Sequence, residues 1–543
     1  MAKITITNFG GMAPRINPAA LALPKATLAK NCILGNGDIR PLQGTVDVLT
    51  PAKVGAKKSI FRLGNTTDPS LYWLTWTSDV DVARGAIAGD PTERLYYTGD
   101  GPPKMTTLAL ATQGSTVYPA TFRALGVPAP TMAPTATADS IPPGPNGTSP
   151  STYKRAYVVT YVTDLGEEGP PSPPSMSVTV QDGTRVRLTA LPTAPSGAYS
   201  VVAKRIYRTE EGAYRFTAEI PIATTTFDDT VPGTSLGEEL KTLGFIPPPS
   251  GLMGLCAMQN GIMAGFSGND VMFCAPYMPY AWPIEYMLTM NSPVVAIASF
   301  GQSLVVGTTS NPHLITGIDP AAMSEERLDI PQACVSKRSM ISVGSGVVYA
   351  SPDGLVYIGL GGSRMVTAAH FTGKEWQAFR PESMHCAWYD NTLYVFYDNG
   401  TTKGALIFSS LDGNGDLSIT DVWADATYVD PLTDALYLMD NARNKIVRFN
   451  AGQNLTWEYS PPTMVTGDGF TPSAGRVLSD GYPVEFTLTS DSGQSYTATV
   501  SSPAPFRLPG WRSEWYKLLM KCSAGGRAYR VDLATSMTEL RQS

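Results

Sequence analysis

Short runs in which apolar and polar residues alternate, separated by turn-forming residues, recur along most of this chain of 543 residues. The longest run extends from Tyr153 to Thr163 and ends at the turn residues 164–168. A period of two is typical of β-strands, whose successive side chains point to opposite faces. The one clear helical spacing begins at Pro24, a residue type favoured at the first helical position, and runs to Asn31. The pattern predicts a mainly β protein with one short N-terminal helix.

The clearest predicted unit covers residues 152–245. Six or seven short strands follow one another here, and a turn at Asp182–Gly183 separates two that can pair. This spacing predicts a small β-sandwich, and the strand order resembles a fibronectin type III-like module. The preceding stretch, 127–151, is crowded with Pro, Ala, Thr and Gly and can bury little apolar surface. We therefore predict a linker at 127–151, which marks a domain boundary.

Short apolar strands with Gly, Asn or Asp in nearly every gap fill residues 246–455. Such gaps leave no room for ordinary helices, and radial closure protects the edges of many short sheets. We predict a β-propeller here, although no strict repeat motif sets the number of blades. Residues 456–543 are predicted to form a C-terminal β domain, and residues 1–126 an N-terminal β region belonging to the propeller or to a platform.

Composition supports this interpretation and adds a charge asymmetry. Charged residues make up only 16% of the chain, below the usual quarter, as expected of sheets joined by turns. The net charge is -6, yet residues 1–62 hold nine basic and two acidic residues, so this segment carries +7 and the remainder -13. The segment either presents a basic surface or meets an acidic partner or DNA backbone. The overall acidity argues against tight, non-specific DNA binding.

The six cysteines are scattered and form no C-x-x-C pair. Scattered cysteines in apolar contexts usually behave as small buried hydrophobes, so we expect no disulfide framework and synthesis in a reducing cytosol. The first residues lack the apolar core of a signal peptide, and no apolar run approaches the length of a membrane span. We expect no membrane insertion by this chain.

Catalytic and cofactor motifs are not found. The three histidines, His313, His370 and His385, are far apart in the sequence, and we interpret each as a surface or hydrogen-bonded residue rather than a metal ligand. A phosphate-binding loop is missing, and residues 265–269 depart from the nucleophile elbow at their last position. We therefore predict no catalytic residues, no cofactor and no metal, and a protein that is not an enzyme.

One short stretch weakly resembles a calcium-binding loop. Asp412, Asn414 and Asp416 place acids and an amide at alternate positions, as the start of a calcium loop does. Leu417 and Trp423 stand where that loop needs Gly and Glu. We favour a hairpin turn, with adventitious calcium binding as the alternative.

Two further residue classes leave alternatives open. Paired carboxylates could build a glycosidase site, but four Glu pairs lie beside turns, where we expect solvated side chains. These pairs are Glu167–Glu168, Glu210–Glu211, Glu238–Glu239 and Glu325–Glu326. Tryptophans can line a sugar-binding face or fill the space between sheets, and we favour packing. The residues concerned are Trp73, Trp76, Trp282, Trp376, Trp388 and Trp423.

Short motifs in a fixed order along nearly the whole chain resemble those of phage nozzle proteins, also described as tubular tail or packaged-DNA stabilisation proteins. The N-terminal motifs are Phe9-Gly10-Gly11-Met12-Ala13-Pro14-Arg15, Leu23-Pro24, Ala29-Lys30-Asn31-Cys32 and Gly37-Asp38-Ile39-Arg40-Pro41-Leu42. The central motifs are Arg205-Ile206-Tyr207-Arg208-Thr209, Phe227-Asp228-Asp229, Leu236-Gly237-Glu238, Pro247-Pro248-Pro249, Ala281-Trp282-Pro283, Thr316-Gly317, Cys334-Val335-Ser336 and Tyr349-Ala350-Ser351-Pro352-Asp353-Gly354-Leu355. The last are Pro505-Phe506-Arg507-Leu508-Pro509, Leu533-Ala534 and Glu539-Leu540.

The resemblance implies a structural virion protein of a short non-contractile tail, made in the host cytoplasm. It implies a β-propeller with appended β domains, assembled as a homohexameric ring below the head–tail adaptor and attached to fibres, spikes or a needle. DNA ejection would then bring only transient, non-specific contact with double-stranded DNA, because an acidic or neutral lumen repels phosphates. The alternatives are a host-polysaccharide-binding module of a tail fibre and a propeller glycosidase.

Overall fold

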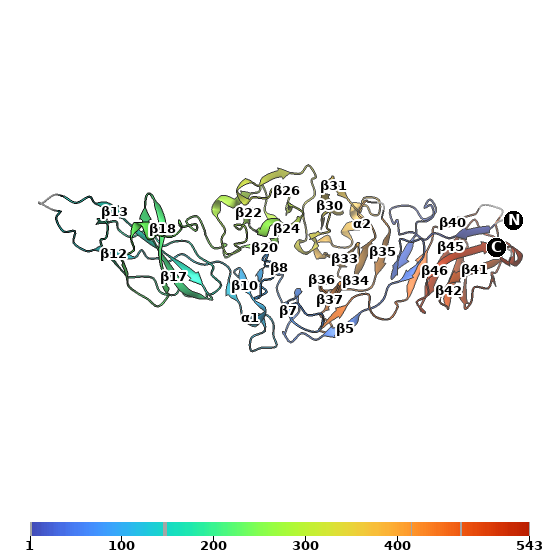
Figure 1. Cartoon of the computed structure of the whole chain (residues 1–543). Helices are drawn as coiled ribbons and strands as arrows, with labels where there is room; N and C mark the ends of the chain where they lie inside the picture. The colour runs from blue at the N-terminus through green and yellow to red at the C-terminus, as the bar shows by residue number, and fades with distance from the viewer. Residues whose placement is uncertain (1–2, 145–148, 414, 467–469, 542–543) are drawn as a thin grey trace. The chain divides into compact units, whose positions relative to one another are not determined.

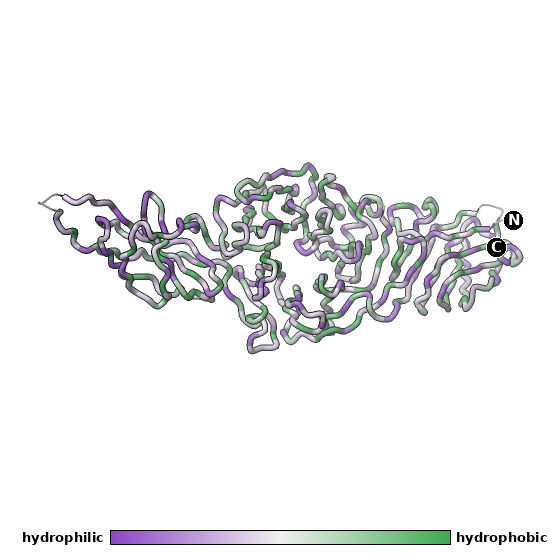
Figure 2. The backbone as a smooth tube through the Cα atoms, viewed as in Figure 1, coloured by the Kyte–Doolittle hydropathy of each residue, from purple (hydrophilic) through white to green (hydrophobic). Residues whose placement is uncertain are grey.

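The computed structural model describes residues 3–144, 149–413, 415–466 and 470–541. Strands account for nearly all of the regular structure, and hydrophobic and hydrophilic residues alternate at short intervals along them (Figures 1 and 2). The strands form many small sheets in which neighbours run antiparallel almost throughout. The prediction of a mainly β protein is confirmed.

Helices are short in the part of the chain that the structure describes. The three α-helices are α1 (Leu108–Thr112), α2 (Gly373–Gln377) and α3 (Met537–Arg541), each of five residues. Searched for membrane spans, the described ranges contain no helix that is both long and apolar enough to cross a bilayer.

The chain divides into two compact units. Unit 1 comprises Met1–Thr77, Val295–Leu314 and Glu326–Ser543, and unit 2 comprises Ser78–Val294 and Ile315–Glu325. Four strands follow one another where the chain passes between them, and these are β24 (Val294–Phe300), β25 (Ser303–Thr308), β26 (His313–Thr316) and β27 (Ser324–Arg327).

Unit 2 contains two four-stranded sheets and a group of smaller ones. The first four-stranded sheet consists of β8 (Asp81–Arg84), β9 (Leu95–Thr98), β10 (Lys104–Thr106) and β11 (Arg123–Ala124), and the second of β20 (Met253–Ala257), β21 (Met263–Ser267), β22 (Asp270–Phe273) and β23 (Met287–Thr289). The smaller sheets are β14 (Tyr157–Thr163) with β17 (Val201–Glu210) and β18 (Ala213–Pro221), β12 (Thr135–Ala138) with β16 (Val186–Thr189) and β19 (Phe227–Asp229), and β13 (Tyr153–Arg155) with β15 (Val178–Val180).

Strand β14 is buried on both faces. Tyr157 and Val159 point into a core shared with Leu188 of β16, whereas Val158 packs with Tyr207 on the other face. All seven residues of the strand are buried. The two-residue alternation therefore separates two apolar environments here, rather than a core from solvent.

Part of the stretch predicted to be a linker is a strand. Residues 135–138 form β12, which pairs antiparallel with β16 so that Thr135 lies opposite Thr189. Ala136 and Ala138 pack against the core of these sheets. The linker prediction is wrong for these four residues, because small side chains alternating with threonine suit a strand despite the surrounding prolines. Residues 145–148, also within the predicted linker, lie outside the described residues.

Unit 1 contains one long sheet, which follows the order β32, β33, β34, β35, β2, β39, β45, β42 and β43, with β40 also paired to β45. Its strands are β32 (His385–Tyr389), β33 (Thr392–Asp398), β34 (Lys403–Phe408), β35 (Leu417–Thr420), β2 (Leu28–Lys30), β39 (Trp457–Ser460), β45 (Trp515–Cys522), β42 (Val484–Ser490), β43 (Ser495–Val500) and β40 (Met464–Val465).

Five smaller sheets complete unit 1. They are β1 (Lys3–Ile6), β46 (Ala528–Ala534), β41 (Ala474–Ser479) and β44 (Phe506–Arg507); β28 (Ile341–Ser342), β29 (Gly346–Ala350), β30 (Leu355–Gly359) and β31 (Gly362–Met365); β36 (Ala426–Asp430), β37 (Ala435–Asp440), β38 (Lys445–Arg448) and β5 (Val46–Leu49); β3 (Cys32–Ile33) and β4 (Arg40–Pro41); and β6 (Ser59–Arg62) and β7 (Trp73–Trp76).

The first fifty residues are interleaved with later parts of unit 1. Strand β1 pairs with β46, β2 lies between β35 and β39, and β5 pairs with β38. The helix predicted from Pro24 to Asn31 is therefore wrong, because β2 occupies its second half. A short helix is marginal by itself, and hydrogen bonding to two neighbouring strands outweighs its weak local preference.

Candidate functional site

The basic N-terminal segment has partners within its own unit. Five of its cations form ion pairs, namely Lys3–Asp532 at 3.4 Å, Lys25–Asp416 at 3.6 Å, Lys30–Asp421 at 2.8 Å, Arg40–Asp38 at 3.1 Å and Arg62–Asp430 at 2.5 Å. The Arg62 side chain is buried and also donates to the carbonyls of Thr66 and Asp68. Four of these pairs use acids from later parts of the chain, so part of the positive excess is balanced within unit 1.

The three histidines are all buried, so of the two expected roles, surface or hydrogen-bonded, none of them has the surface one. The ring of His370 approaches the carbonyl oxygen of Gly415 through Nε2 at 3.0 Å. His385 stacks on Phe396, with 5.0 Å between the ring centroids, and burial holds the pKa of His385 well below its usual value. His385 is therefore an uncharged aromatic core residue at neutral pH.

The tryptophans noted in the sequence serve packing. Trp73, Trp76, Trp282 and Trp376 are buried, and Trp388 and Trp423 are half-buried. Trp376 also donates from Nε1 to the carbonyl oxygen of Ser351 at 2.9 Å. These contacts favour the core interpretation over an exposed sugar-binding face.

The calcium look-alike lies between β34 and β35. Asn414 lies outside the described residues. The Asp416 carboxylate accepts the backbone N–H of Gly11 at 2.6 Å and pairs with Lys25, so it already serves a contact within unit 1. Across the described ranges, no group of three or more His, Cys, Asp or Glu residues could hold a metal ion.

The four Glu pairs differ in exposure. Glu167 is buried, contrary to the expectation of a solvated side chain. Its neighbour Glu168 accepts hydrogen bonds from Thr160, Tyr207 and Arg205 at 2.6–2.8 Å. The other three pairs are exposed or, for Glu210, half-buried. The turn that follows β14 folds back onto the sheet, and sequence alone does not reveal this burial.

Burial raises the pKa of Glu167 to about 6, against the opposing influence of the Arg94 guanidinium 3.8 Å away. A carboxyl whose pKa is higher in the folded state binds its proton more tightly there, so stability falls as pH rises from about 4.5 to about 6. We predict that this loss is roughly 2 kcal/mol and that it disappears in Glu167→Gln. Urea unfolding at pH 4.5 and pH 7 measures it; exposed Glu239→Gln is the control, and equal pH dependence in both variants would contradict the prediction.

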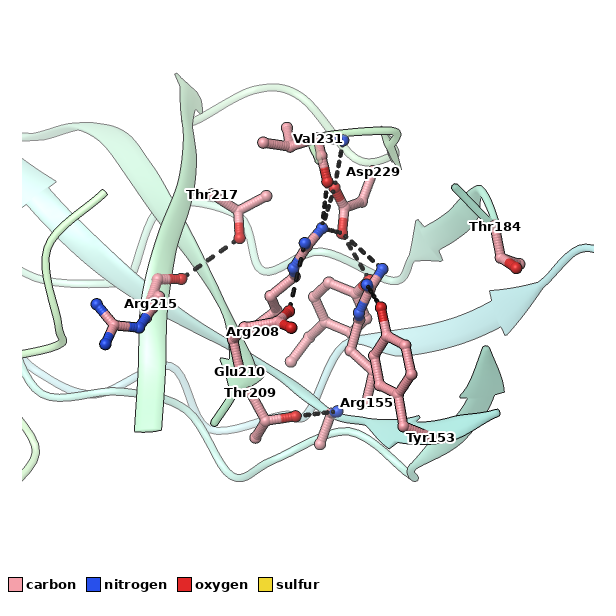
Figure 3. A network of polar contacts seen from close by, with 12 residues as sticks. Tyr153, Arg155, Thr184, Arg208, Thr209, Glu210, Arg215, Thr217, Asp229 and Val231 are labelled. Atoms are coloured by element: carbon pink, nitrogen blue, oxygen red, sulfur yellow. Dashed lines mark hydrogen bonds and ion pairs between the residues drawn. The ribbon is translucent and has the colours of Figure 1, made fainter. Parts of the chain in front are cut away.

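A buried charged network lies at one end of the smaller sheets of unit 2 (Figure 3). Asp229, at the end of β19, is fully buried and accepts from Arg208 of β17 at 2.8 Å and from the Tyr157 hydroxyl at 2.7 Å. Arg155 of β13 lies 3.5 Å from the same carboxylate. One buried carboxylate thus contacts side chains from three other strands. Its charge can be buried because these side chains supply ion pairs and hydrogen bonds.

The network extends outward to an exposed rim. The Arg155 guanidinium donates to the Tyr153 hydroxyl at 2.7 Å and lies 5.4 Å from the centroid of that ring. Arg208 also donates to the Glu210 carboxylate at 3.4 Å. Asp229 therefore fixes two rim side chains, Tyr153 and Glu210, through the two arginines (Figure 3).

Beside this rim lies an open depression of about 440 Å³. Its lining includes Tyr153, Lys154, Asp182, Thr209, Glu210 and Glu211, all from the ends of strands or from the turns that join them. The Tyr153 residue is 37% exposed, so its ring is available to a ligand. We call this depression the Tyr153 pocket. The sequence does not reveal it, because its residues come from three separate stretches of the chain.

Two other depressions in unit 2 have different linings. One, of about 440 Å³, includes Glu168, Arg205 and Tyr207, whose polar atoms bond to one another. The other, of about 390 Å³, is lined by prolines, Tyr161 and Tyr199. The first is committed to internal contacts, and the lining of the second mixes apolar groups with polar ones such as Thr193 and Ser196.

Comparison with known proteins does not refine the description of the fold. No family model and no curated protein sequence matches the chain. Solved structures with some likeness include BBS1N in complex with ARL6DN (7% identity, 49% of this chain, 86% of that chain, TM-score 0.24) and the extracellular domain of BT4673 from B. thetaiotaomicron (8%, 84%, 47%, 0.29). PorZ of Porphyromonas gingivalis is another (10%, 96%, 88%, 0.26). The sheets of the structure itself define the class, a mainly β protein of many small antiparallel sheets.

Proposed function

We propose that this chain is the nozzle of a short non-contractile phage tail, a structural protein that forms a ring-shaped conduit for DNA and joins the head–tail adaptor to fibres or a needle. The observation that carries the proposal is that residues of the nozzle-like motifs make contacts that hold separate strands and turns together. Close contacts between interleaved chain segments suit a part that must keep its shape while DNA passes.

The N-terminal motif makes the first of these contacts. Gly10 donates its N–H to the Pro24 carbonyl oxygen at 2.8 Å, and the Tyr459 hydroxyl donates to the carbonyl oxygen of Gly10 at 3.1 Å. A Cβ added to Gly11 would lie 2.2 Å from the backbone nitrogen of Leu417. The motif needs glycine because two chain segments approach each other at backbone distance.

The central motifs provide other such contacts. Arg208 and Asp229 form the buried network of unit 2, and the Trp282 N–H donates to the Ile246 carbonyl oxygen. In the Tyr349–Leu355 motif, the Ser351 hydroxyl donates to the Gly354 carbonyl oxygen within the β29–β30 hairpin. These contacts support the resemblance, because the motif residues named here stabilise the fold at the positions where they lie.

We further propose that the small sheets are blades of a β-propeller. Several are four-stranded and follow one another along the chain, such as β8–β11, β20–β23 and β28–β31. Strand β5, from the N-terminal segment, completes the sheet of β36, β37 and β38. Closing a sheet with a strand from a distant part of the chain is an effective way to protect the edges of radially arranged sheets.

The physical role proposed for such a ring is passive. Because several cations of the N-terminal segment already pair with carboxylates, the surplus acids of the remaining chain can give the lumen a neutral or negative surface. Such a surface repels phosphates, so DNA slides without being held. Weak DNA binding even at low salt is the expected property.

The test is electron microscopy of the purified chain, alone and mixed with capsids that carry the portal and adaptor. We expect rings with a central channel, formed in solution or on the capsids. A protein that stays a solitary globule and never joins a particle contradicts the proposal. Release of reducing sugar from host polysaccharide would instead indicate a glycosidase.

A further inference from the structure

The Tyr153 pocket combines an apolar ring with spread hydrogen-bonding groups. Asp182, Glu210 and Glu211 contribute carboxylates, which accept hydrogen bonds from hydroxyl groups. The Lys154 ammonium donates to the Thr179 hydroxyl at 2.8 Å and keeps two further protons for a ligand. The exposed Tyr153 ring adds a flat apolar surface. The pocket therefore offers acceptors, a donor and a stacking face together.

The spacing of the carboxylates argues against a point cation. A bound metal needs several oxygen ligands within about 2.6 Å of one centre. Within the described parts of the chain, no three acidic, His or Cys side chains converge in this way. Acceptors spread around an open depression suit instead a ligand with several hydroxyl groups around its rim.

The two rim groups are held in place before any ligand arrives. Arg155 holds the Tyr153 hydroxyl, Arg208 holds Glu210, and the buried Asp229 anchors both arginines. Side chains fixed in this way lose little conformational entropy on binding, which is how preorganised sites gain affinity. The buried network thus holds Tyr153 and Glu210 in place at the rim of the depression.

We propose that the Tyr153 pocket binds a sugar unit of a polysaccharide, stacking the apolar face of the sugar ring on Tyr153 and accepting its hydroxyl protons on Glu210, Glu211 and Asp182. The net negative lining selects a neutral sugar over a phosphorylated or acidic one. This inference does not depend on the nozzle assignment, because it concerns one pocket of unit 2 and not assembly.

The test is saturation-transfer NMR of the full chain with maltohexaose, mannohexaose and chitohexaose as probes. An open polar site should bind at least one with a dissociation constant on the order of 1 mM. Tyr153→Leu, which removes the ring but keeps apolar bulk, should weaken binding about tenfold. Glu211→Gln, an exposed turn substitution that leaves the buried network untouched, should weaken binding as well.

Controls separate the pocket from general surface adhesion. Tyr277→Leu changes an exposed tyrosine elsewhere in unit 2, and Glu239→Gln changes an exposed carboxylate outside the pocket, so both should bind like the wild type. Absence of binding by all three probes at about 10 mM overturns the proposal. Equal losses in the control variants overturn it too. Salt-sensitive binding of oligolysine, lost in Glu211→Gln without any sugar binding, would reassign the pocket to a basic peptide.

Discussion

Asp229→Asn should cost unit 2 about 3–5 kcal/mol of unfolding free energy, because the change removes the buried carboxylate that Arg208 and Arg155 share and leaves Arg208 only the more distant Glu210. Arg208 and Arg155 are both buried, and Asp229 is the carboxylate that Arg208 contacts through two oxygens. Asparagine keeps the shape of the side chain but carries no charge. The measurement is hydrogen exchange of the amides of β14 and β17 combined with urea unfolding, since a chain with two units need not unfold in one step.

The neighbouring residue supplies a matched control. Asp228 carries the same carboxylate one position earlier, but its side chain is 40% exposed and lies 3.7 Å from Arg185 and Arg187. Exposed ion pairs contribute little, so Asp228→Asn should change stability by less than about 1 kcal/mol. Similar stability losses in the two variants would show that burial does not set the strength of this network.

Gly11→Ala should destabilise unit 1 by more than about 4 kcal/mol or prevent its folding. The added Cβ would lie 2.2 Å from the Leu417 backbone nitrogen and 2.5 Å from the Asp416 Cα. Both are backbone atoms, so no side-chain rotation can relieve the overlap. Moving them would displace β35, and with it the pairing of β2. Thermal unfolding and the yield of soluble protein measure the effect.

Gly361→Ala is the control within the same unit. Gly361 stands between β30 and β31, and an added Cβ there meets nothing within 4 Å. Its stability should stay within about 0.5 kcal/mol of the wild type. A Gly11→Ala protein as stable as Gly361→Ala would mean that the N-terminal segment does not pack against β35 as closely as the structure has it.

Local pattern sufficed for some features of this protein. The alternation from Tyr153 to Thr163 predicts one long strand. The residues are extended as predicted, but they divide at Ala156 into β13 and β14, which belong to different sheets. The turn-forming sequence Asp491-Ser492-Gly493-Gln494 likewise indicates a hairpin, and it joins β42 to β43. Such features depend on neighbours in the chain, so a window of ten residues contains the information that specifies them.

Other features depend on partners hundreds of residues away. The second half of the stretch from Pro24 to Asn31 has a strand conformation only because β35 and β39 flank it. The same holds for the cations of the N-terminal segment, since Lys3 meets Asp532 and Arg62 meets Asp430 across most of the chain length. Charge counts along the sequence cannot show which carboxylate a cation will meet.

The amino-acid sequence by itself determined that this is a mainly β protein whose scattered cysteines and tryptophans serve mostly in packing. Only the tertiary structure decided which strands pair, which charges are buried and where Tyr153, Asp182 and Glu211 meet in one pocket. The physical reason is that strand formation and apolar burial follow from local alternation, whereas sheet pairing and charge burial are long-range contacts whose partners are chosen by the whole fold.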